Sequence, residues 1–494
     1  MVILKLIGHE YFNEVSDIIK LFFGKEEIKL YDNYKNNLDR QGILLISQII
    51  KADDLTSFTS SYQKLGDTTE NGNCYTYTKN GQIDDIKIIK KSLKLSMYKL
   101  LSDITGRDLP WGVLTGIRPV KIVHQLYENG MNEEEIVQHL KDEYLISEDR
   151  SLLSISIAQV EKKYIDKSNK HQVSIYVGIP FCPSRCGYCS FTSNAIDKNR
   201  NLVIPYLEAL MLEIREVSAY LKSKGVTAQT IYIGGGTPTS INAEEFNMLI
   251  QCINEYWSGY KEFTCEAGRP DTITLDKLKV IKEGRVTRLS INPQTMDDET
   301  LVRIGRKHTH VQVIESFELA RSLGFDNINM DMIIGLPGEG LEQVENTLNW
   351  MNKLNPENVT VHTLAIKRAS IYNEMNLDIG CNNNDTASMM MELAREKLGS
   401  NGYYPYYLYR QKYMAENLEN IGFCKKDKEC IYNIQIMEEK QSIIAFGADA
   451  VTKAYFPEED RLERQHNIKD LKLYIENIHS QINKKLELLS LLNL

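Results

Sequence analysis

The residues best suited to chemistry are three cysteines in one short segment, Cys182-Pro-Ser-Arg-Cys186-Gly-Tyr188-Cys189. The segment follows the apolar run 173–181, which predicts a strand, so the cysteines stand on the loop after it. Thiolates are the usual ligands of iron–sulfur clusters, and a four-iron cluster normally takes four of them. This motif offers three, because residue 191 is Phe191 and not a fourth cysteine. One iron would therefore be open to a small molecule.

Two other interpretations of close cysteines are a structural zinc site and a disulfide. A structural zinc takes four ligands, usually as two separated pairs, and no second pair stands at suitable spacing in this chain. A disulfide needs an oxidising compartment, to which nothing in the sequence points. The spacing favours the cluster.

Further polar residues stand at the ends of later predicted strands. The turn Gly234-Gly235-Gly236-Thr237 would let the backbone approach a ligand closely, although such a turn is as often structural. Glu266 ends the next strand, where a carboxylate is often only a solvated loop residue. Gln294 can donate and accept hydrogen bonds, and Arg306 offers a planar fork suited to carboxylates. Asp331 lies inside an apolar strand, so it needs a partner or faces the site.

These positions depend on an alternation of strands and helices that begins near residue 172. Six such repeats predict a parallel sheet with right-handed crossovers, either doubly wound or closed as a barrel. A barrel places its functional residues on the loops after the strands, where the motifs above stand. The predicted strands are 173–181, 229–234, 262–267, 286–292, 327–335 and 358–366, and the predicted helices are 202–222, 242–256, 275–283, 310–323, 341–353 and 384–398.

The composition is that of an ordinary globular chain. The 494 residues are 42% hydrophobic and 25% charged, and the formal charge of -9 disfavours a general polyanion binder. Lysines at 87, 90, 91 and 94 share one face of a predicted helix, which reads as a solvated face or, less simply, as a nucleic-acid or membrane-surface patch. No stretch approaches the length of a membrane span, the N-terminus lacks a secretion pattern, and the cysteines are otherwise scattered. We expect a cytoplasmic protein that contacts no membrane or nucleic acid.

The length predicts two or three domains. An α+β accessory domain is expected over residues 1–165, ending in a polar linker. The strand–helix repeats occupy 172–400, and a mixed or helical region over 401–494 is expected to cover the substrate. The segment Ile443–Val451 reads as a glycine turn between apolar runs that covers the open side of the barrel.

The cysteine segment resembles the signature of the radical S-adenosylmethionine (SAM) enzymes, with its three-then-two spacing and an aromatic residue before the last cysteine. The resemblance implies a partial barrel of six strand–helix units and a [4Fe-4S] cluster whose open iron binds the amine and carboxylate of SAM. Reduction of that cluster then splits SAM into methionine and a 5′-deoxyadenosyl radical.

Residues 170–460 are similar to the oxygen-independent coproporphyrinogen III oxidase (coproporphyrinogen dehydrogenase) group of this family. Thr360–Ser370, Tyr407–Tyr413 and the turn Trp111–Lys121 resemble its HemZ-like branch. The resemblance implies catalytic roles for Tyr176, Glu266 and Asp331. The positions that match SAM contacts are Tyr176, Tyr188, Gly235, Gly236, Thr237, Glu266, Gln294, Arg306, Asp331 and Ala365.

The sequence departs from the family pattern in two places. Gly178 stands where the best-studied members have histidine, and Phe191 stands where those members have a further cysteine beyond the cluster triplet. His308 resembles the related heme-chaperone branch, but His466-Asn matches only the first two residues of that branch's C-terminal heme motif.

A substrate with four propionates needs cations, although the whole chain is acidic. Candidates are Lys367 and Arg368 after the sixth strand, and Arg410 and Lys412 in the tyrosine-rich segment 403–413. The alternative is that these are surface charges, and tyrosines at this density more often pack in a core than hold a cofactor.

The resemblance implies oxidative decarboxylation of two propionates of coproporphyrinogen III, giving protoporphyrinogen IX in heme biosynthesis. It also implies a flavodoxin- or ferredoxin-type electron donor. A heme chaperone and a radical SAM enzyme that modifies heme or RNA, such as a methyltransferase, are the alternatives.

Overall fold

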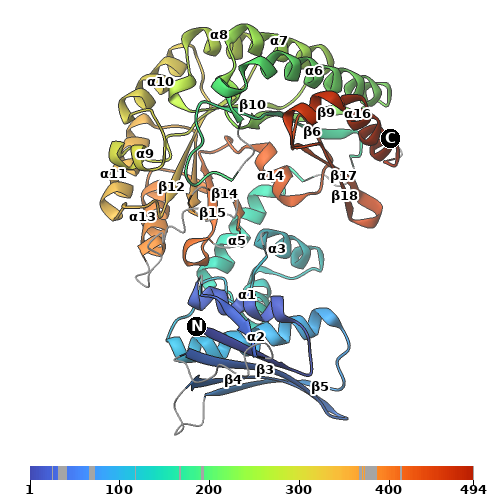
Figure 1. Cartoon of the computed structure of the whole chain (residues 1–494), viewed down its shortest axis with the longest axis vertical. Coiled ribbons are helices and arrows are strands. Elements are labelled where there is room, and N and C mark those ends of the chain that lie inside the picture. The colour runs from blue at the N-terminus through green and yellow to red at the C-terminus, as the bar shows by residue number, and fades with distance from the viewer. Residues whose placement is uncertain are drawn as a thin grey trace. The chain divides into compact units, whose positions relative to one another are not determined.

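The structure is a computed structural model (Figure 1), and it describes two compact units. One unit holds residues 1–155 with 416–418, and the other holds 156–415 with 419–494. Helix α5 (Glu148–Glu161) crosses the boundary. The predicted division at 165 and 401 stays a prediction. The described residues are 1–24, 26–31, 42–65, 73–116, 118–165, 169–190, 194–365, 370, 372, 386–411 and 414–492.

The first unit is an α+β fold. Its sheet has the strand order β2-β1-β3-β4-β5, with β1 parallel to β2 and β3, and the last three strands antiparallel. Alternate side chains of a strand share one face, so Val2 and Leu4 join Leu45 and Phe58 in a core with Leu93 of α2. The strands are β1 (Val2–Ile7), β2 (Ile28–Leu30), β3 (Gly42–Lys51), β4 (Leu55–Leu65) and β5 (Cys74–Asn80), and the helices before α5 are α1 (Phe12–Phe23), α2 (Ile86–Thr105), α3 (Pro119–Glu128) and α4 (Glu133–Tyr144).

The lysine-rich helix is α2, and most of its lysines are engaged inside this unit. Lys90 pairs with Glu14 at 2.5 Å, Lys91 pairs with Glu143, and the Lys94 ammonium donates to Thr115 Oγ1 at 2.9 Å. These lysines stabilise the unit's packing. They do not form an open cationic face, which weakens the alternative of a nucleic-acid patch.

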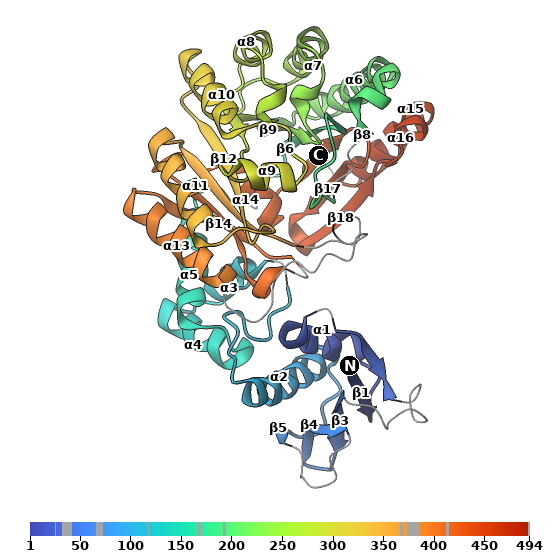
Figure 2. The ribbon, with the colours of Figure 1, turned by 60° about the vertical axis from the view of Figure 1, so that its left-hand side comes forward.

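The second unit contains the predicted strand–helix repeats. Its six central strands are parallel and adjacent in chain order. Figure 2 shows helices α6, α7, α8, α10 and α11 along the outer side of this sheet. All six predicted strands and the six predicted helices are confirmed, with shifts of a few residues at their ends. The strands are β6 (Gln172–Ile179), β9 (Thr227–Gly235), β10 (Glu262–Gly268), β11 (Arg288–Ile291), β12 (Ile328–Ile334) and β13 (Asn358–Thr363), and the helices are α6 (Arg200–Ser223), α7 (Ala243–Tyr256), α8 (Leu275–Glu283), α9 (Asp298–Arg303), α10 (His310–Ser322), α11 (Leu341–Leu354) and α13 (Thr386–Ser400).

The C-terminal region extends this sheet at both edges. At one edge, β14 (Tyr404–Tyr409) and β15 (Asn420–Cys424) add antiparallel strands beyond β13. At the other, β16 (Ile443–Phe446) lies parallel to β6 and leads into the antiparallel β17 (Val451–Phe456) and β18 (Arg461–His466). The expected glycine turn between apolar runs is confirmed, because Gly447, with a φ of 103°, lies between β16 and β17. The expectation that this segment covers the open side of the barrel is wrong, because both apolar runs are strands at the edge of the sheet. Four apolar residues are a strand when a neighbouring edge is free to pair with them, and periodicity alone does not show that edge.

Helix α14 (Ile431–Glu438) lies on the concave side of the sheet, opposite the outer helices (Figure 1). The Glu262 carboxylate accepts hydrogen bonds from the backbone N–H groups of Ile431 and Tyr432, at 2.9 and 3.1 Å. Arg288 donates to the carbonyl oxygens of Lys428 and Glu429, at 2.9 and 2.8 Å. Both side chains come from the amino ends of their strands, so they anchor α14 as a floor at that end of the barrel.

A second buried network holds the last helices, α15 (Leu471–Glu476) and α16 (Ile478–Ser490), against α6. Glu213 on α6 is fully buried and pairs with the fully buried Lys485 of α16. It also accepts hydrogen bonds from Tyr474 Oη at 2.7 Å and from Asn467 Nδ2 at 2.8 Å. A buried charge with this many partners marks a fixed junction.

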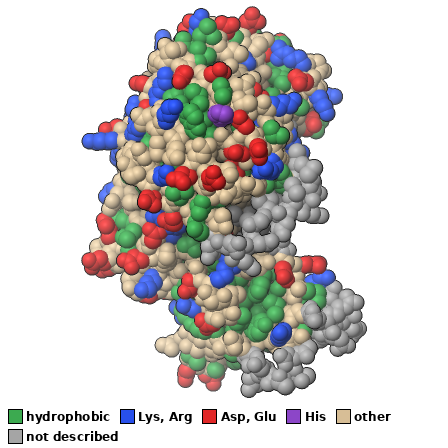
Figure 3. Space-filling model, turned by 90° about the vertical axis from the view of Figure 1, so that its left-hand side faces the viewer, with side chains coloured by type: hydrophobic (Ala, Val, Ile, Leu, Met, Phe, Trp, Pro, Cys, Tyr) green, Lys and Arg blue, Asp and Glu red, His purple; other side chains and the backbone are tan. Residues whose placement is uncertain are grey.

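In the described part of the chain, no helix is long and apolar enough to cross a bilayer. Acidic and basic side chains are interspersed among the described residues on the face shown in Figure 3.

Candidate functional site

The three motif cysteines lie together on the loop after β6. Cys182 and Cys186 are buried and Cys189 is partly buried, and the Cys189 N–H donates to the Cys186 carbonyl oxygen at 3.2 Å. Burial raises the pKa of the Cys182 thiol to about 11, and the nearby Cys189 and Cys186 add to the rise. Burial therefore disfavours the charged form of the Cys182 thiol, and a bound metal would stabilise that charge. None of the cysteines among the described residues forms a disulfide.

The glycine turn after β9 packs directly on this loop. The N–H groups of Gly236 and Thr237 donate to the carbonyl oxygens of Ile179 and Phe181, at 2.8 and 2.7 Å. A Cβ atom at Gly236 would lie 2.6 Å from the Phe181 oxygen and 2.8 Å from Cys182 Sγ. Glycine is therefore required here by the approach of the turn to the cysteine loop.

The segment after α9 holds the other side of the cysteine loop. The Gly187 N–H donates to the Ile304 carbonyl oxygen at 3.0 Å. Buried Arg306 donates to the Asn292 carbonyl oxygen at 2.5 Å and to Tyr188 Oη at 3.3 Å. The structure thus brings together Tyr188 and Arg306, two residues that the sequence analysis placed at the same ligand.

On the concave face, tyrosines from two strands and the floor helix form a stack. The rings of Tyr232 and Tyr432 are 4.4 Å apart, and the Tyr176 ring lies about 6 Å from each of them. Tyr232 donates a hydrogen bond to the Glu266 carboxylate. Burial raises the pKa of Glu266 to about 7; the Tyr232 hydrogen bond lowers it, and the Asp331 charge raises it. Glu266 can therefore hold or release a proton near neutrality.

Asp331 lies on the same face and is held as an anion. The pKa of Asp331 is lowered from its usual value. Burial alone would raise this pKa, but the hydrogen bond and the charge of His362 lower it. Hydrogen bonds from Asn329 and Thr360 lower it further. The His362 Nε2 and Asp331 Oδ2 atoms are 3.7 Å apart, and Asn329 Nδ2 donates to Asp331 Oδ1 at 2.7 Å. The partner that the sequence analysis required for Asp331 is thus present.

Gln294 has an unusual backbone and an unsatisfied side chain. Its φ is 70°, which is uncommon for a residue other than glycine, and its N–H donates to the Asp331 carbonyl oxygen at 2.9 Å. The Oε1 atom is buried without a hydrogen-bond partner among the described residues. Such an orphaned acceptor is costly unless a ligand donor reaches it, so Gln294 fits a binding role.

Of the four basic residues predicted to bind the substrate, the structure describes one. Arg410 follows β14 and is 2% exposed, so it is not a surface charge. Lys367, Arg368 and Lys412 lie outside the described residues. Ala365 is partly buried and forms a bridge to Met414. In the tyrosine-rich segment, Tyr403, Tyr406 and Tyr407 are buried, which confirms the simpler interpretation of core packing for these three.

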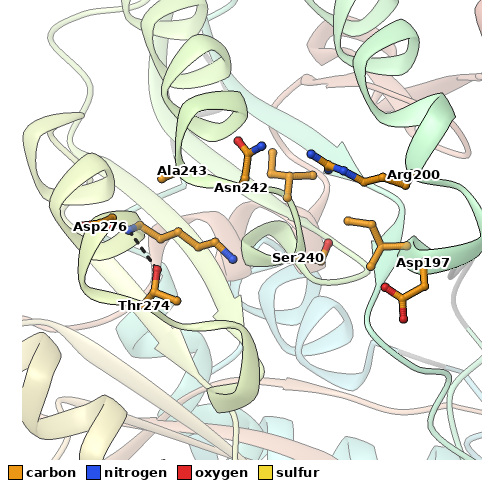
Figure 4. Close-up of a pocket in the computed structure, with 10 residues that line it drawn as sticks. Asp197, Arg200, Ser240, Asn242, Ala243, Thr274 and Asp276 are labelled. Carbon is orange, nitrogen blue, oxygen red and sulfur yellow. Dashed lines mark hydrogen bonds between the residues drawn. The ribbon is translucent and has the colours of Figure 1, made fainter.

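An open pocket of about 360 Å³ lies at the first turns of α7 and α8 (Figure 4). Its cations are engaged: Arg200 donates to both oxygens of Glu245, and Lys277 donates to the carbonyl oxygens of Thr239 and Thr272. We assign this pocket no ligand. Its lining residues are Ile196, Asp197, Arg200, Ser240, Ile241, Asn242, Ala243, Thr274, Asp276 and Lys277.

The structure also places residues at the site that the sequence analysis did not assign. His362 alternates with Thr360 along β13, so both face the concave side, and this alternation is the signal that could have identified it. Tyr432 gave no such signal, because its position depends on how Glu262 and Arg288 seat α14. Arg269, directly after β10, donates hydrogen bonds to Ser184 on the cysteine loop.

Comparison with known proteins agrees with this geometry. Residues 176–351 match the family model of the radical SAM superfamily. The chain is 41% identical over 408 residues to the oxygen-independent coproporphyrinogen-III oxidase-like protein HemZ of Bacillus subtilis, covering 82% of this chain and 81% of that one. It is also 34% identical over 282 residues to the heme chaperone HemW of Bacillus subtilis, covering 56% of this chain and 70% of that one.

Among solved structures, the fold is similar to the coproporphyrinogen III oxidase HemN of Escherichia coli. The TM-score is 0.52 at 22% identity, over 66% of this chain and 73% of that one. At this identity the similarity establishes the fold, a partial barrel of parallel strands with outer helices.

Proposed function

The chain belongs to the radical SAM superfamily, in the group of the oxygen-independent coproporphyrinogen III oxidases and their HemZ-like relatives, and from this premise we propose that it decarboxylates coproporphyrinogen III. In the proposed reaction, two propionate side chains each lose a hydrogen atom to a 5′-deoxyadenosyl radical, one electron to an external one-electron acceptor, and carbon dioxide, leaving two vinyl groups in protoporphyrinogen IX. The family implies a [4Fe-4S] cluster and SAM as cofactors.

The residues on the cysteine loop and its neighbours fit these cofactors. Cys182, Cys186 and Cys189 would hold three irons and leave the fourth for SAM. The orphaned acceptor of Gln294 would be a polar partner for SAM, and the glycine turn packs against Cys182, which would place the turn beside the cluster. The proposed SAM-contacting residues are Tyr176, Tyr188, Gly235, Gly236, Thr237, Glu266, Gln294, Arg306, Asp331 and Ala365.

When bound, the cluster and SAM supply the electron transfer and the hydrogen-atom abstraction. The chain's own residues orient the reactants and control protons. Asp331 stays charged and can accept hydrogen bonds, whereas Glu266 can exchange a proton near neutrality. Tyr176 keeps its hydroxyl proton, because burial raises the pKa of this phenol. We propose catalytic roles for Tyr176, Glu266 and Asp331 because they lie on neighbouring parts of one concave face.

One observation carries the proposal: a glycine turn touches a cysteine of the motif, and two carboxylates with opposite pKa shifts occupy the adjoining concave face. Buried Arg410 is the described candidate for a propionate partner, and Lys367, Arg368 and Lys412 remain predictions. A flavodoxin- or ferredoxin-type protein is the proposed electron donor, and the cytoplasm is the proposed compartment.

The test is anaerobic incubation of the reconstituted protein with SAM, a chemical reductant and coproporphyrinogen III, followed by mass analysis. We expect loss of carbon dioxide from two propionates together with formation of 5′-deoxyadenosine. Cleavage of SAM at the same rate with and without coproporphyrinogen, and no decarboxylated product, would contradict the proposed substrate. The Cys186→Ala protein is the matched control, because it should yield neither product.

A heme chaperone is the second candidate, favoured by the 34% identity to HemW. In the C-terminal segment that partly resembles the chaperone motif, Asn467 is buried and donates to Glu213 and to the Gly447 carbonyl oxygen, both at 2.8 Å. Asn467 therefore has a structural role, whereas His466 is exposed. Stoichiometric heme binding that is lost in His466→Ala, without decarboxylation in the assay above, would favour this second function.

A further inference from the structure

The turn after β10 sends one buried arginine into the cysteine loop. Arg269 is 3% exposed, and its guanidinium donates to Ser184 twice: to the hydroxyl at 2.7 Å and to the carbonyl oxygen at 3.2 Å. Ser184 stands between the first two cysteines of the motif. One side chain thus fixes both the backbone and the side chain at the middle of the loop.

The opposite edge of the same guanidinium is held by a carboxylate. Its Nε and Nη2 atoms donate to the two oxygens of Asp271, at 3.0 and 2.6 Å. This two-pronged pair fixes the plane of the guanidinium. The Asp271 Oδ1 atom also lies 3.9 Å from His308, whose side chain is fully buried.

The support behind Arg269 is continuous with the glycine turn. Thr272 Oγ1 donates to the Arg269 carbonyl oxygen at 2.8 Å, and Thr239 Oγ1 donates to the Ala267 carbonyl oxygen at 2.6 Å. On its other side, Ser184 Oγ is 3.3 Å from the Gly305 carbonyl oxygen. The loop segment around Ser184 is therefore held between two turns, one at Arg269 and one at Gly305.

We propose that Arg269 is a positioning residue that holds the segment from Cys182 to Cys186 in its chelating shape before the cluster is inserted. The proposal rests on the cluster site of the proposed function. Preorganisation lowers the ordering cost of binding, so the loss of Arg269 would weaken the site although Arg269 ligates no iron. Lysine can replace it only in part, because a single ammonium lacks the fork that meets Ser184 and Asp271 together.

The experiment compares wild type, Arg269→Gln and Arg269→Lys. Anaerobically reconstituted proteins are treated with a chelator, and the loss of the brown absorbance is followed. We expect loss about ten times faster or more in Arg269→Gln, with Arg269→Lys between that variant and wild type. In the apo-proteins, amide hydrogen exchange of residues 182–189 should be faster in Arg269→Gln, a readout that involves no cluster.

Lys277→Met is the matched control. This side chain also holds the same pair of turns, through the carbonyl oxygens of Thr239 and Thr272, but no hydrogen bond to the cysteine loop is found for it among the described residues. In Lys277→Met, the rate at which chelator removes the brown absorbance should equal that of wild type. Amide hydrogen exchange of residues 182–189 should also be unchanged. If Arg269→Gln does not fold, Ser184→Ala removes the shorter of the two contacts and should raise the chelator rate about threefold or more.

Wild-type chelator rates in folded Arg269→Gln, or in Ser184→Ala where the former does not fold, would overturn the proposal. A fall in melting temperature with unchanged chelator rate and unchanged exchange at 182–189 would also overturn it, because that result describes an arginine that only stabilises the fold. Absence of a cluster from wild type itself would instead contradict the proposed function.

Discussion

The two ends of the barrel contain the same kinds of residue in different arrangements. At the carboxyl end, Cys182 and Cys186 lie on one loop beside Arg269. At the amino end, Cys424 and Cys430 are buried beside Arg288, and Cys430 Sγ contacts Glu262 Oε1 at 3.3 Å. Burial raises the pKa of both floor thiols well above the usual range, and the nearby carboxylates add to the rise.

The difference lies in what fixes the sulfur atoms. The floor cysteines lie on β15 and directly before α14, so pairing and packing fix each one separately among tyrosines. The cysteines at the carboxyl end share one loop, and the shape of this loop depends on the residues that contact it. Burial and a nearby arginine therefore do not distinguish a metal-ligating cysteine from a cysteine that only packs in the core. The distinguishing feature is a loop that brings several sulfur atoms together.

The largest effect is expected from removing one cysteine at each end. Cys186→Ala should abolish the brown chromophore and SAM cleavage, whereas Cys424→Ala and Cys265→Ala should retain both, because those two are packed in the core. Iron content and 5′-deoxyadenosine formation measure the difference. Full SAM cleavage in Cys186→Ala would remove the functional distinction between the two ends.

The next largest effect is expected at Arg288, which holds helix α14 in place. Arg288→Met should lower the free energy of unfolding by about 3–5 kcal/mol, because it leaves the Glu262 carboxylate buried without its cation. Urea unfolding measures this loss. Adding Glu262→Gln should recover part of it. Iron bound per folded molecule should equal that of wild type, and a specific loss of iron would show that the floor is part of the site.

A smaller effect is expected at the glycine turn. From the sequence, Gly236→Val is expected to weaken SAM binding while the cluster survives. The structure revises this, because the added Cβ meets Cys182 Sγ at 2.8 Å. Overpacking of about 1–3 kcal/mol should lower cluster content as well as SAM affinity. Gly399→Ala is the control, since nothing lies within 4 Å of its Cβ position, and it should bind both cofactors like wild type.

The smallest expected effect depends on pH and concerns Glu266, near the carboxyl end of β10. The pKa of Glu266 is raised by burial to about 7, so the folded apo-protein holds a proton that the unfolded chain releases at lower pH. Stability contributed by this proton is present below the unfolded pKa and is lost as pH rises toward 7. Glu266→Gln should therefore gain stability over wild type, by about 2 kcal/mol between pH 5 and pH 8. If the difference in unfolding free energy between Glu266→Gln and wild type were the same at all pH values, this result would contradict the titration of Glu266.

The sequence predicted the repeated part of the fold and the cysteine loop, because local patterns specify both. Strand 327–335 is an apolar run, and the cysteine spacing lies within eight residues. The partners of these residues were harder to predict. Arg269 reaches Ser184 across 85 positions, and Tyr432 stacks on Tyr232 across 200 positions. Such contacts depend on register and on side-chain direction, which periodicity does not specify.

The placement of β16 has a consequence for the order in which the chain can fold. Strand β6 opens the barrel, yet its outer edge pairs with residues 443–446, which leave the ribosome more than 260 residues later. Until then, this edge offers unpaired backbone groups to any other strand. Glu213 also lacks its cation until Lys485 has been synthesised. The outer edge of β6 therefore stays unpaired until residues 443–446 have been synthesised, and a chain stopped before residue 440 would be prone to aggregate through the edge of this strand.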